Sequence, residues 1–560
     1  MPCLRPLDGL WTAALLVAGL GAVACAADAA WAEMPSPLGA VTVEPARAAT
    51  PVAADSTPSA ADPSPTAVPA RPAKLVAADL VAVHREAASA PAWHADVAML
   101  ASATQMGQFA VDRGGVLSPA NADLTGRLHA GVAGHSGRWL GRLQVRGAMS
   151  GEVASGTWAG ATTLQGDRLP ASGQGKLEPT EAWLGASWGQ VVDVRAGLMG
   201  SNWGVGLVAR DGKIQTMDTA WFYVPKVGDR VVRGALTLTP FRGTTSLLRG
   251  LAVSVAADRV YADDVLYAGD SATQVVGSVR LFLAEDEWLG LYYAGRNQTS
   301  TSGRGLDVSV VDAAFDVKIA TRVAPLRLLG EAALITGTTK LAPTVEFPTH
   351  DVLQGAALLR AIADFSLGLR VHLDLAWLSG DANYGDGTAT AFKGDPNAKL
   401  GVVLFPRVMA WQTGRARLAA SDPNVVGQAP YDLNRIGTGG GLSNSYIVFP
   451  KIGHAFLERG EVYGGVLLAW TSVPLADPRW TMTDGGGTPR NFLGNKATSS
   501  LLGTEFDAGV RWRFPVPHQP AHLLLSAEAG LLLPGGALVG LSDPIPAGRV
   551  TLAWLGHEAR

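Results

Sequence analysis

The chain has 560 residues, of which 48% are hydrophobic and only 17% are charged, and its formal net charge is −3. This balance argues against nucleic-acid binding, which requires a strongly basic face, and no apolar run after the N-terminal region is long enough for a membrane-spanning helix. The two cysteines, Cys3 and Cys25, both lie near the N-terminus. The rest of the chain is therefore expected to contain no disulfide, thiolate metal site or other cofactor.

Residues 1–32 have the features of a secretory signal peptide. Arg5 supplies the positive charge, residues 10–24 form the apolar segment, and Ala30-Trp31-Ala32 is a small-x-small cleavage site. Cleavage before Cys25 would instead create a lipidation site, but the leucine usual three residues before a lipidated cysteine is missing. We therefore expect export by the Sec pathway and cleavage after residue 32.

Residues 33–98 are predicted to form a tether in the periplasm. The first part is rich in alanine, proline, serine and threonine, and such a segment cannot bury enough apolar surface to fold. The last part, 76–98, could form a short helix before the folded domain.

Residues 99–560 show the alternation of a β-strand in segment after segment. In Leu367–Asp381 the odd positions are apolar up to Trp377, while Arg370, His372 and Asp374 occupy even positions. Successive side chains of a strand point to opposite faces, so each such segment has an apolar and a polar face. Repeated over more than four hundred residues behind a signal peptide, this pattern indicates a transmembrane antiparallel β-barrel, with lipid outside and water inside.

Short and long connections alternate along this region, as an outer-membrane barrel requires. The count comes to about 18 strands if 381–443 is one long surface loop and the first strand lies near Gln105–Arg113; 16 strands is the next candidate. A soluble β-sandwich is the alternative, but so many strands would need more than one domain. Aromatic residues near strand ends are typical of a girdle at the membrane interface: Trp139, Trp188, Trp288, Tyr293, Trp377, Trp470, Trp512 and Trp554.

The inward positions of the predicted strands carry many arginines interleaved with carboxylates. One interpretation is structural, because opposite charges on neighbouring strands stabilise the wall. The other is an arginine-lined constriction that selects anions, since guanidinium groups bind carboxylate, phosphate or sulfate in a bidentate manner. The candidate pore-lining residues are Arg142, Arg146, Arg195, Arg280, Arg360, Arg370, Asp374, Arg511, Arg513 and Glu528.

The predicted long loop 381–443 allows two interpretations. Asp381, Asn383 and Asp386 could offer oxygen ligands to Ca²⁺, but the same residue types are ordinary turn formers, and we expect no metal. The loop is also long enough to fold into the pore as a lid or constriction.

A resemblance to a known family rests on three segments: WLSGDANYGDGTATAFKGD, SYIVFPKIGHAFLERGEVYGGVLLAW and LGTEFDAGVRWRF. They resemble the C-terminal half of alginate-export-type outer-membrane porins. Upstream, DVRAGLMGSNWGVGLVARDGK and VGDRVVRGAL are similar to a family of uncharacterised predicted outer-membrane proteins. The resemblance covers roughly residues 180–555 and implies an 18-stranded barrel that passes an anionic polysaccharide through an arginine-rich lumen. It transfers no specific substrate-binding residue.

The sequence thus predicts a monomeric porin in the outer membrane of a Gram-negative cell, for passive diffusion or export of polar, anionic solutes or polysaccharide. Its expected partners are outer-membrane lipid, the barrel-assembly machinery and the solute. We find no nucleophile elbow, zinc-binding HExxH motif or phosphate loop, so an enzyme is not expected. The alternative is a plugged barrel that serves as a surface adhesin or assembly scaffold.

Overall fold

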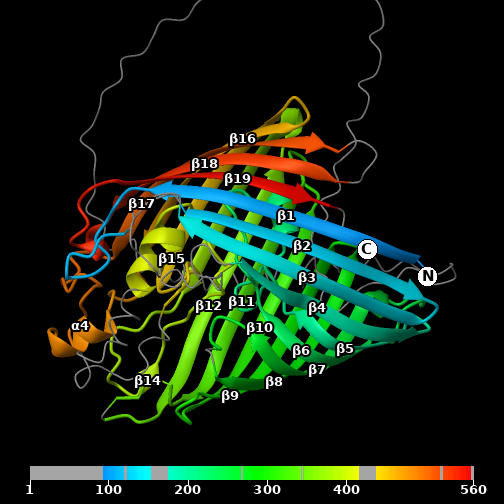
Figure 1. The fold of residues 1–560 in the computed structure, drawn as a ribbon, viewed down its shortest axis with the longest axis horizontal. Helices are drawn as coiled ribbons and strands as arrows, with labels where there is room; N and C mark the ends of the chain where they lie inside the picture. The colour runs from blue at the N-terminus through cyan, green and yellow to red at the C-terminus, as the bar shows by residue number, and fades with distance from the viewer. Residues whose placement is uncertain are drawn as a thin grey trace, which may run out of the picture. The chain divides into compact units, whose positions relative to one another are not determined.

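The strands of the chain close into one antiparallel barrel (Figure 1). The computed structural model describes residues 92–118, 123–152, 175–266, 269–341, 343–344, 346–414, 437–516 and 521–556. Eighteen long strands form the ring, because β1 pairs with β2 on one side and with β19 on the other. The two-residue β14 lies outside the ring and pairs in parallel with β12. The predicted count of 18 strands is confirmed.

The first half of the ring consists of β1 (Ala92–Met106), β2 (Asp123–Ser136), β3 (Trp139–Glu152), β4 (Gly175–Trp188), β5 (Val192–Gly200), β6 (Arg230–Leu238), β7 (Leu251–Ala262), β8 (Ser271–Ala284) and β9 (Glu287–Thr299). The second half consists of β10 (Gly305–Ile319), β11 (Leu326–Thr339), β12 (His350–Asp364), β13 (Leu369–Leu378), β15 (Ser445–Phe456), β16 (Gly460–Trp470), β17 (Leu501–Pro515), β18 (His522–Pro534) and β19 (Ile545–Leu555). The short elements are β14 (Thr388–Ala389), α4 (Pro478–Thr483), η1 (Ile214–Asp218), η2 (Leu247–Gly250), η3 (Ser366–Gly368), η4 (Leu404–Met409) and η7 (Gly536–Leu538).

The start of the barrel differs from the prediction. β1 begins at Ala92, so the predicted tether boundary at residue 98 and the predicted first strand at Gln105–Arg113 were both wrong. The strand was missed because small residues carry much of its alternation, and alanine favours strands only weakly. It is needed for closure, since Ser102 of β1 contacts Thr551 of β19 through their hydroxyls at 3.0 Å. Residues 1–91 lie outside the described part, so the signal peptide and most of the tether stay predictions.

The two faces of the wall are as the alternation predicts. On β13, His372 and Asp374 are buried toward the lumen, and Trp377 is exposed on the outer face. Large apolar side chains such as Val275 of β8 and Leu291 of β9 are exposed on the outer face of the wall. Lipid solvates such a surface well, and water solvates it poorly. Trp288 is an exception among the predicted girdle residues. It is 5% exposed and packs inward. In the described part of the chain, no helix is long and apolar enough to cross a membrane.

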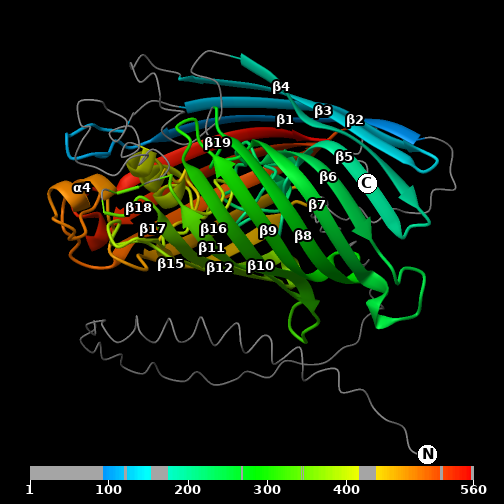
Figure 2. The ribbon, with the colours of Figure 1, turned by 90° about the horizontal axis from the view of Figure 1, so that it is seen from below.

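The barrel has one end with mostly short turns and one end with long loops. The turns, on the right in Figure 1, include the tight connection between β2 and β3. The long loops, on the left, include α4. Figure 2 shows the same strands from below.

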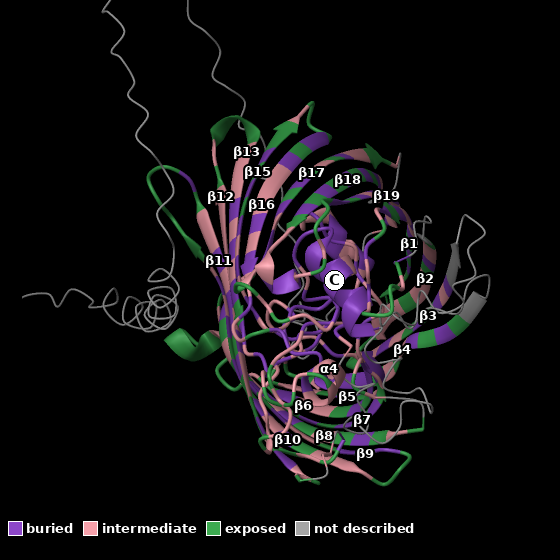
Figure 3. Ribbon diagram, turned by 90° about the vertical axis from the view of Figure 1, so that its left-hand side faces the viewer, coloured by how far each residue is buried: buried purple, intermediate pink, exposed green. Residues whose placement is uncertain are grey.

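The described residues of two long connections lie inside the barrel instead of over its rim. Inner loop 1, residues 201–229, joins β5 to β6 and contains η1; inner loop 2, residues 379–444, joins β13 to β15 and contains β14 and η4. Figure 3, which views the barrel from the long-loop end, shows buried segments inside the ring of strands. The prediction that residues 381–443 form a surface loop was wrong for the described residues, and the expectation that this loop could fold into the pore is confirmed for them.

The inner loops fold inward because the wall offers them an apolar surface. Near the long-loop end the inward positions of β12 to β19 change from charged to apolar, as at Leu378, Ile447 and Leu532. Phe405 and Trp411 of inner loop 2 pack into this surface and are fully buried. Burial of such side chains contributes about 1.5–3 kcal/mol each. The barrel therefore has a hydrophobic core inside its lumen at this level.

Candidate functional site

The candidate site is the lumen, where the wall meets the inner loops. The charges of the wall are largely organised in pairs across neighbouring strands. Arg142 contacts Glu181 at 2.8 Å and Asp96 at 3.2 Å, and Arg146 pairs with Glu178. These pairs fit the structural interpretation of the arginines, in which cross-strand charges stabilise the wall.

Other predicted pore-lining residues are also paired with carboxylates. Arg195 bonds Asp193 on its own strand at 2.7 Å, and Arg370 pairs with Asp364 near the turn end. Asp374 is fully buried and lies between Arg360 at 2.7 Å and Lys451 at 2.6 Å. This triad joins three adjacent strands, so its charges serve first to hold the wall together.

Arg280 is held by aromatic rings. Its guanidinium carbon lies 4.5 Å from the ring centre of Trp203 and 4.9 Å from that of Trp288. Trp203 belongs to inner loop 1, and its indole nitrogen donates to Asp312 of β10 at 2.8 Å. Cation–π contacts gain strength when the cation is shielded from water. Arg280 thus helps to hold inner loop 1 against β8 and β9.

Two wall glutamates bind the backbone of the inner loops. Glu331 of β11 accepts hydrogen bonds from the N–H groups of Gly206, Leu207 and Val208 in inner loop 1, at 2.8 to 3.1 Å. In this arrangement consecutive N–H groups converge on one carboxylate, which is the geometry of a backbone anion-binding nest. The Glu331 carboxylate therefore occupies the anion-binding nest that inner loop 1 forms.

Glu505 of β17 binds inner loop 2 in the same manner. It accepts hydrogen bonds from the N–H groups of Val402, Val403 and Leu404 at 2.5, 2.7 and 2.7 Å. Gly401 precedes them with φ +76°, and a Cβ there would lie 2.7 Å from the Glu505 carboxylate. Two features therefore favour glycine at position 401: its left-handed backbone conformation and the nearby carboxylate, which leaves no room for a Cβ.

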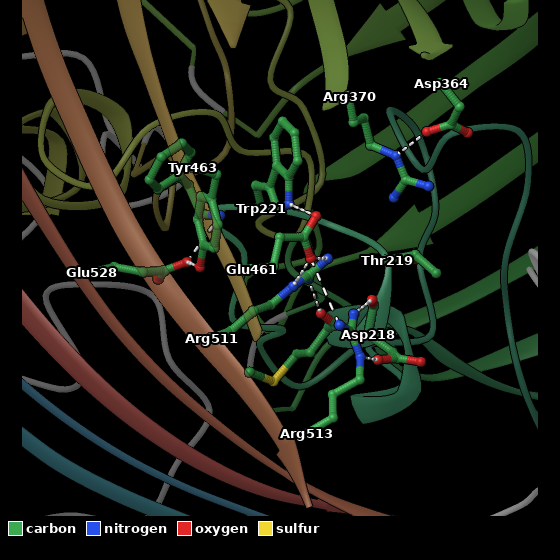
Figure 4. A network of polar contacts seen from close by, with 12 residues as sticks. Asp218, Thr219, Trp221, Asp364, Arg370, Glu461, Tyr463, Arg511, Arg513 and Glu528 are labelled. Atoms are coloured by element: carbon green, nitrogen blue, oxygen red, sulfur yellow. Dashed lines mark hydrogen bonds and ion pairs between the residues drawn. The ribbon is translucent and has the colours of Figure 1, made fainter. Parts of the chain in front are cut away.

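A stack of rings fixes the middle of inner loop 1 (Figure 4). The indole of Trp221 lies between His372, with ring centres 4.1 Å apart, and Tyr463, 5.3 Å away; both pairs are nearly parallel. Its nitrogen donates to Glu461 at 3.0 Å. Tyr463 in turn donates to Glu528 at 2.7 Å, and Glu528 accepts from the backbone N–H of Phe222 at 3.0 Å.

Arg511 and Arg513, also labelled in Figure 4, extend this network of stacked rings and hydrogen bonds, which we call the clamp. Arg511 is buried and bonds Glu461 at 2.6 Å. Arg513 bonds the carboxylate of Asp218 at 2.7 Å and its carbonyl at 2.8 Å. Burial opposes ionisation of Asp218, but His522 and Arg513 outweigh it and hold its pKa well below the usual range. Two of the predicted pore-lining arginines thus hold inner loop 1.

The inner loops meet each other at Tyr223 and Asp395. The backbone N–H of Arg210 donates to Asp395 at 3.1 Å, and the N–H of Lys226 donates to Asn397 at 2.5 Å. Arg210 and Lys399 both lie over the ring of Tyr223, at 4.9 and 5.7 Å from its centre. Burial raises the pKa of Tyr223 to about 12 and that of Asp395 to about 6. Hydrogen bonds thus join the two inner loops at a junction that holds both acidic and basic side chains.

The ten predicted residues all lie on strands of the wall, and the structure brings Arg511, Arg513 and Glu528 together in the clamp. Sequence reasoning missed Glu505, Glu461 and the whole of inner loop 1 as partners. One signal was present: Gly204-Val-Gly-Leu and Gly401-Val-Val-Leu are similar, and each lies where a loop wraps a glutamate.

The calcium interpretation finds no support, since the Asp381 oxygens accept from the N–H groups of Asn383 and Thr390, and no cluster of metal ligands occurs among the described residues.

Comparison with known proteins gives similarity of structure only. No family model and no curated protein matches the sequence. Among solved structures, the chain is similar to a BenF-like porin from Pseudomonas fluorescens Pf-5 (10% identity, 83% of this chain and 99% of that one, TM-score 0.47). It is also similar to Pseudomonas aeruginosa OpdK with vanillate (10%, 82% and 98%, 0.45) and to P. aeruginosa OccK2 (OpdF) in complex with glucuronate (10%, 82% and 98%, 0.43).

Scores at this level carry no residue-level correspondence. The barrel assignment therefore rests on the strand pairing of this chain itself. None of these comparisons shows a similarity to alginate-export porins.

Proposed function

We propose that the protein is an outer-membrane porin of a Gram-negative cell, through which polar solutes diffuse past the two inner loops. The observation that carries the proposal is the closed ring of 18 strands with an apolar outer face and a charged inner face. A soluble barrel would bury its apolar face, whereas a transmembrane barrel exposes it to lipid. A channel is favoured over an enzyme by the fold.

The solute class we infer is anionic. Arg210, Lys226 and Lys399 are partly exposed at the junction of the inner loops, where they lie near the polar interior of the barrel. The wall arginines are largely buried, whereas these three side chains are partly exposed, so the junction is the better candidate for solute contact. Export of an anionic polysaccharide, which the sequence resemblance implies, is one form of this function.

One observation favours a second candidate. The buried apolar side chains of inner loop 2 give the lumen a solid core at the level of η4. This packing is also what a plugged barrel would have, with its long loops serving as a surface adhesin or assembly scaffold.

Conductance of the refolded protein in a planar bilayer tests the choice. A stable current with anion selectivity, read from the reversal potential in a salt gradient, supports the porin. The loss of that selectivity when Lys226 and Lys399 are changed to glutamine would locate it at the junction. No current from folded, inserted protein would reject the porin in favour of the plugged barrel.

A further inference from the structure

One sector of the turn end differs from the rest in charge and exposure. It comprises the turn Gly137–Trp139, the turn at residues 187–191 and the connection at residues 239–250, which we name the basic rim. These segments are adjacent. The N–H of Ser187 donates to the carbonyl of Arg138 at 2.9 Å, and the N–H of Thr239 donates to that of Val191 at 2.8 Å.

The basic rim holds an arginine between two exposed indoles. The guanidinium carbon of Arg138 lies 5.3 Å from the ring centre of Trp139 and 5.7 Å from that of Trp188. The two tryptophans are 58% and 43% exposed, on the outer face of the wall. Such contacts hold a cation in place without neutralising it. The guanidinium therefore keeps its donors for a partner outside the barrel.

The third segment adds exposed apolar side chains and further arginines. Leu247 is 92% exposed, and Leu248 and Phe241 are exposed beside it. Arg242 and Arg249 flank them in sequence. Exposed apolar side chains beside arginines are typical of a surface that rests in the headgroup region of a bilayer.

The rim contains three arginines and no acidic residue in the three segments. The nearest carboxylate in the sequence, Asp193, faces the lumen and bonds Arg195. The acidic turn between β8 and β9, with Glu285, Asp286 and Glu287, lies beside the C-terminal end of the third segment, because Leu251 pairs with Leu281 and Gly250 packs against the carbonyl of Phe282. The basic character is therefore strongest at the other end of the rim, around Arg138.

We propose that the basic rim binds an anionic glycerophospholipid in the membrane leaflet at the turn end. The lipid phosphate would accept hydrogen bonds from the guanidinium of Arg138, and the indoles of Trp139 and Trp188 would lie against the glycerol and upper acyl chains. Tryptophan prefers this level of a bilayer, and each arginine near an anionic lipid surface strengthens binding by about a factor of five. The proposal requires membrane insertion but does not depend on whether the barrel conducts.

Native mass spectrometry of the delipidated full chain in detergent tests the proposal. The probes are phosphatidylglycerol and phosphatidylcholine with identical acyl chains. We expect wild type to retain phosphatidylglycerol preferentially, and Arg138→Ala to bind it roughly five-fold more weakly. Arg322→Ala, which removes an exposed arginine from the turn between β10 and β11, is the matched control and should bind as wild type does.

Three outcomes would overturn the proposal: equal binding of the two lipids by wild type, an unchanged preference in Arg138→Ala, or an equal loss in the Arg322 control. Heat-modifiable migration on a gel shows that each variant is folded. Because Arg138 lies outside the lumen, Arg138→Ala should conduct as wild type does, which separates this result from the test of the porin.

Discussion

Substitution of Glu505 should release inner loop 2 from the wall. Glu505→Ala removes the acceptor of three buried backbone N–H groups. Each donor left without a partner costs about 1–3 kcal/mol, so the gross cost is roughly 3–9 kcal/mol. Removal of the buried carboxylate also recovers several kcal/mol of its desolvation penalty. We therefore expect the substitution to weaken the attachment of inner loop 2 to the wall by about 3 kcal/mol net. This change raises the population of barrels with a released loop by about a hundred-fold.

The assay is single-channel recording in a planar bilayer. Wild type should show a narrow distribution of conductance, and Glu505→Ala should show frequent excursions to higher levels as the loop leaves the lumen. Glu505→Gln keeps one acceptor oxygen and should be intermediate. Asp258→Asn is the control, because Asp258 pairs with Arg233 in the wall at 2.7 Å and should affect stability without the excursions.

Identical traces from Glu505→Ala and wild type would refute the reasoning. They would mean that apolar packing alone holds the loop, with no measurable part played by the glutamate. Excursions of equal frequency in Asp258→Asn would refute it as well, because they would arise from general loosening of the barrel.

Three further predictions follow from the same contacts. Gly401→Ala should reproduce the excursions of Glu505→Ala, whereas Gly303→Ala, at the same φ of +76° but in open space, should cost only the left-handed backbone penalty of about 1–2 kcal/mol and leave the recordings unchanged. Trp221→Ala removes the ring stack and the bond to the wall and should cost about 3–5 kcal/mol, measured as increased proteolysis at residues 213–225; cleavage equal to wild type would contradict the clamp. The folded pKa of Asp395, about 6, lies above its unfolded value near 3.8, so the stabilisation of the folded junction by this group is complete below pH 4 and falls by up to about 3 kcal/mol as the pH rises through 6. Current noise in wild type should therefore rise over this pH window. A rise of equal size in Asp395→Asn would exclude this group as its source.

The clamp changes what the arginine pair Arg511 and Arg513 is expected to do. If they lined an open pore, their loss would lower an anion current. Because they hold Glu461 and Asp218, their loss should instead loosen inner loop 1 and raise the current noise. The sign of the effect distinguishes the two roles.

The sequence by itself determined the barrel. Alternation with period two is a local property of each strand, and lipid outside requires apolar residues at every second position, so β13 could be recognised from ten residues alone. The count of 18 followed from turn and loop parity. The alternation pattern failed to locate β1, because small side chains blur the contrast between the two faces of that strand.

Only the tertiary structure decided what fills the barrel. Whether a long connection folds over the rim or into the lumen depends on surfaces brought together from distant strands. Glu505 and Val402 are about a hundred residues apart, and Trp221 meets Glu461 across 240 positions. The charge on an inward arginine is visible in the sequence, but its partner is not, because the partner of a lumen side chain is set by the closure of the ring and the path of the loops. The basic rim has the same origin: its three segments are separate in the chain, and only the pairing of β3 to β7 makes them one surface.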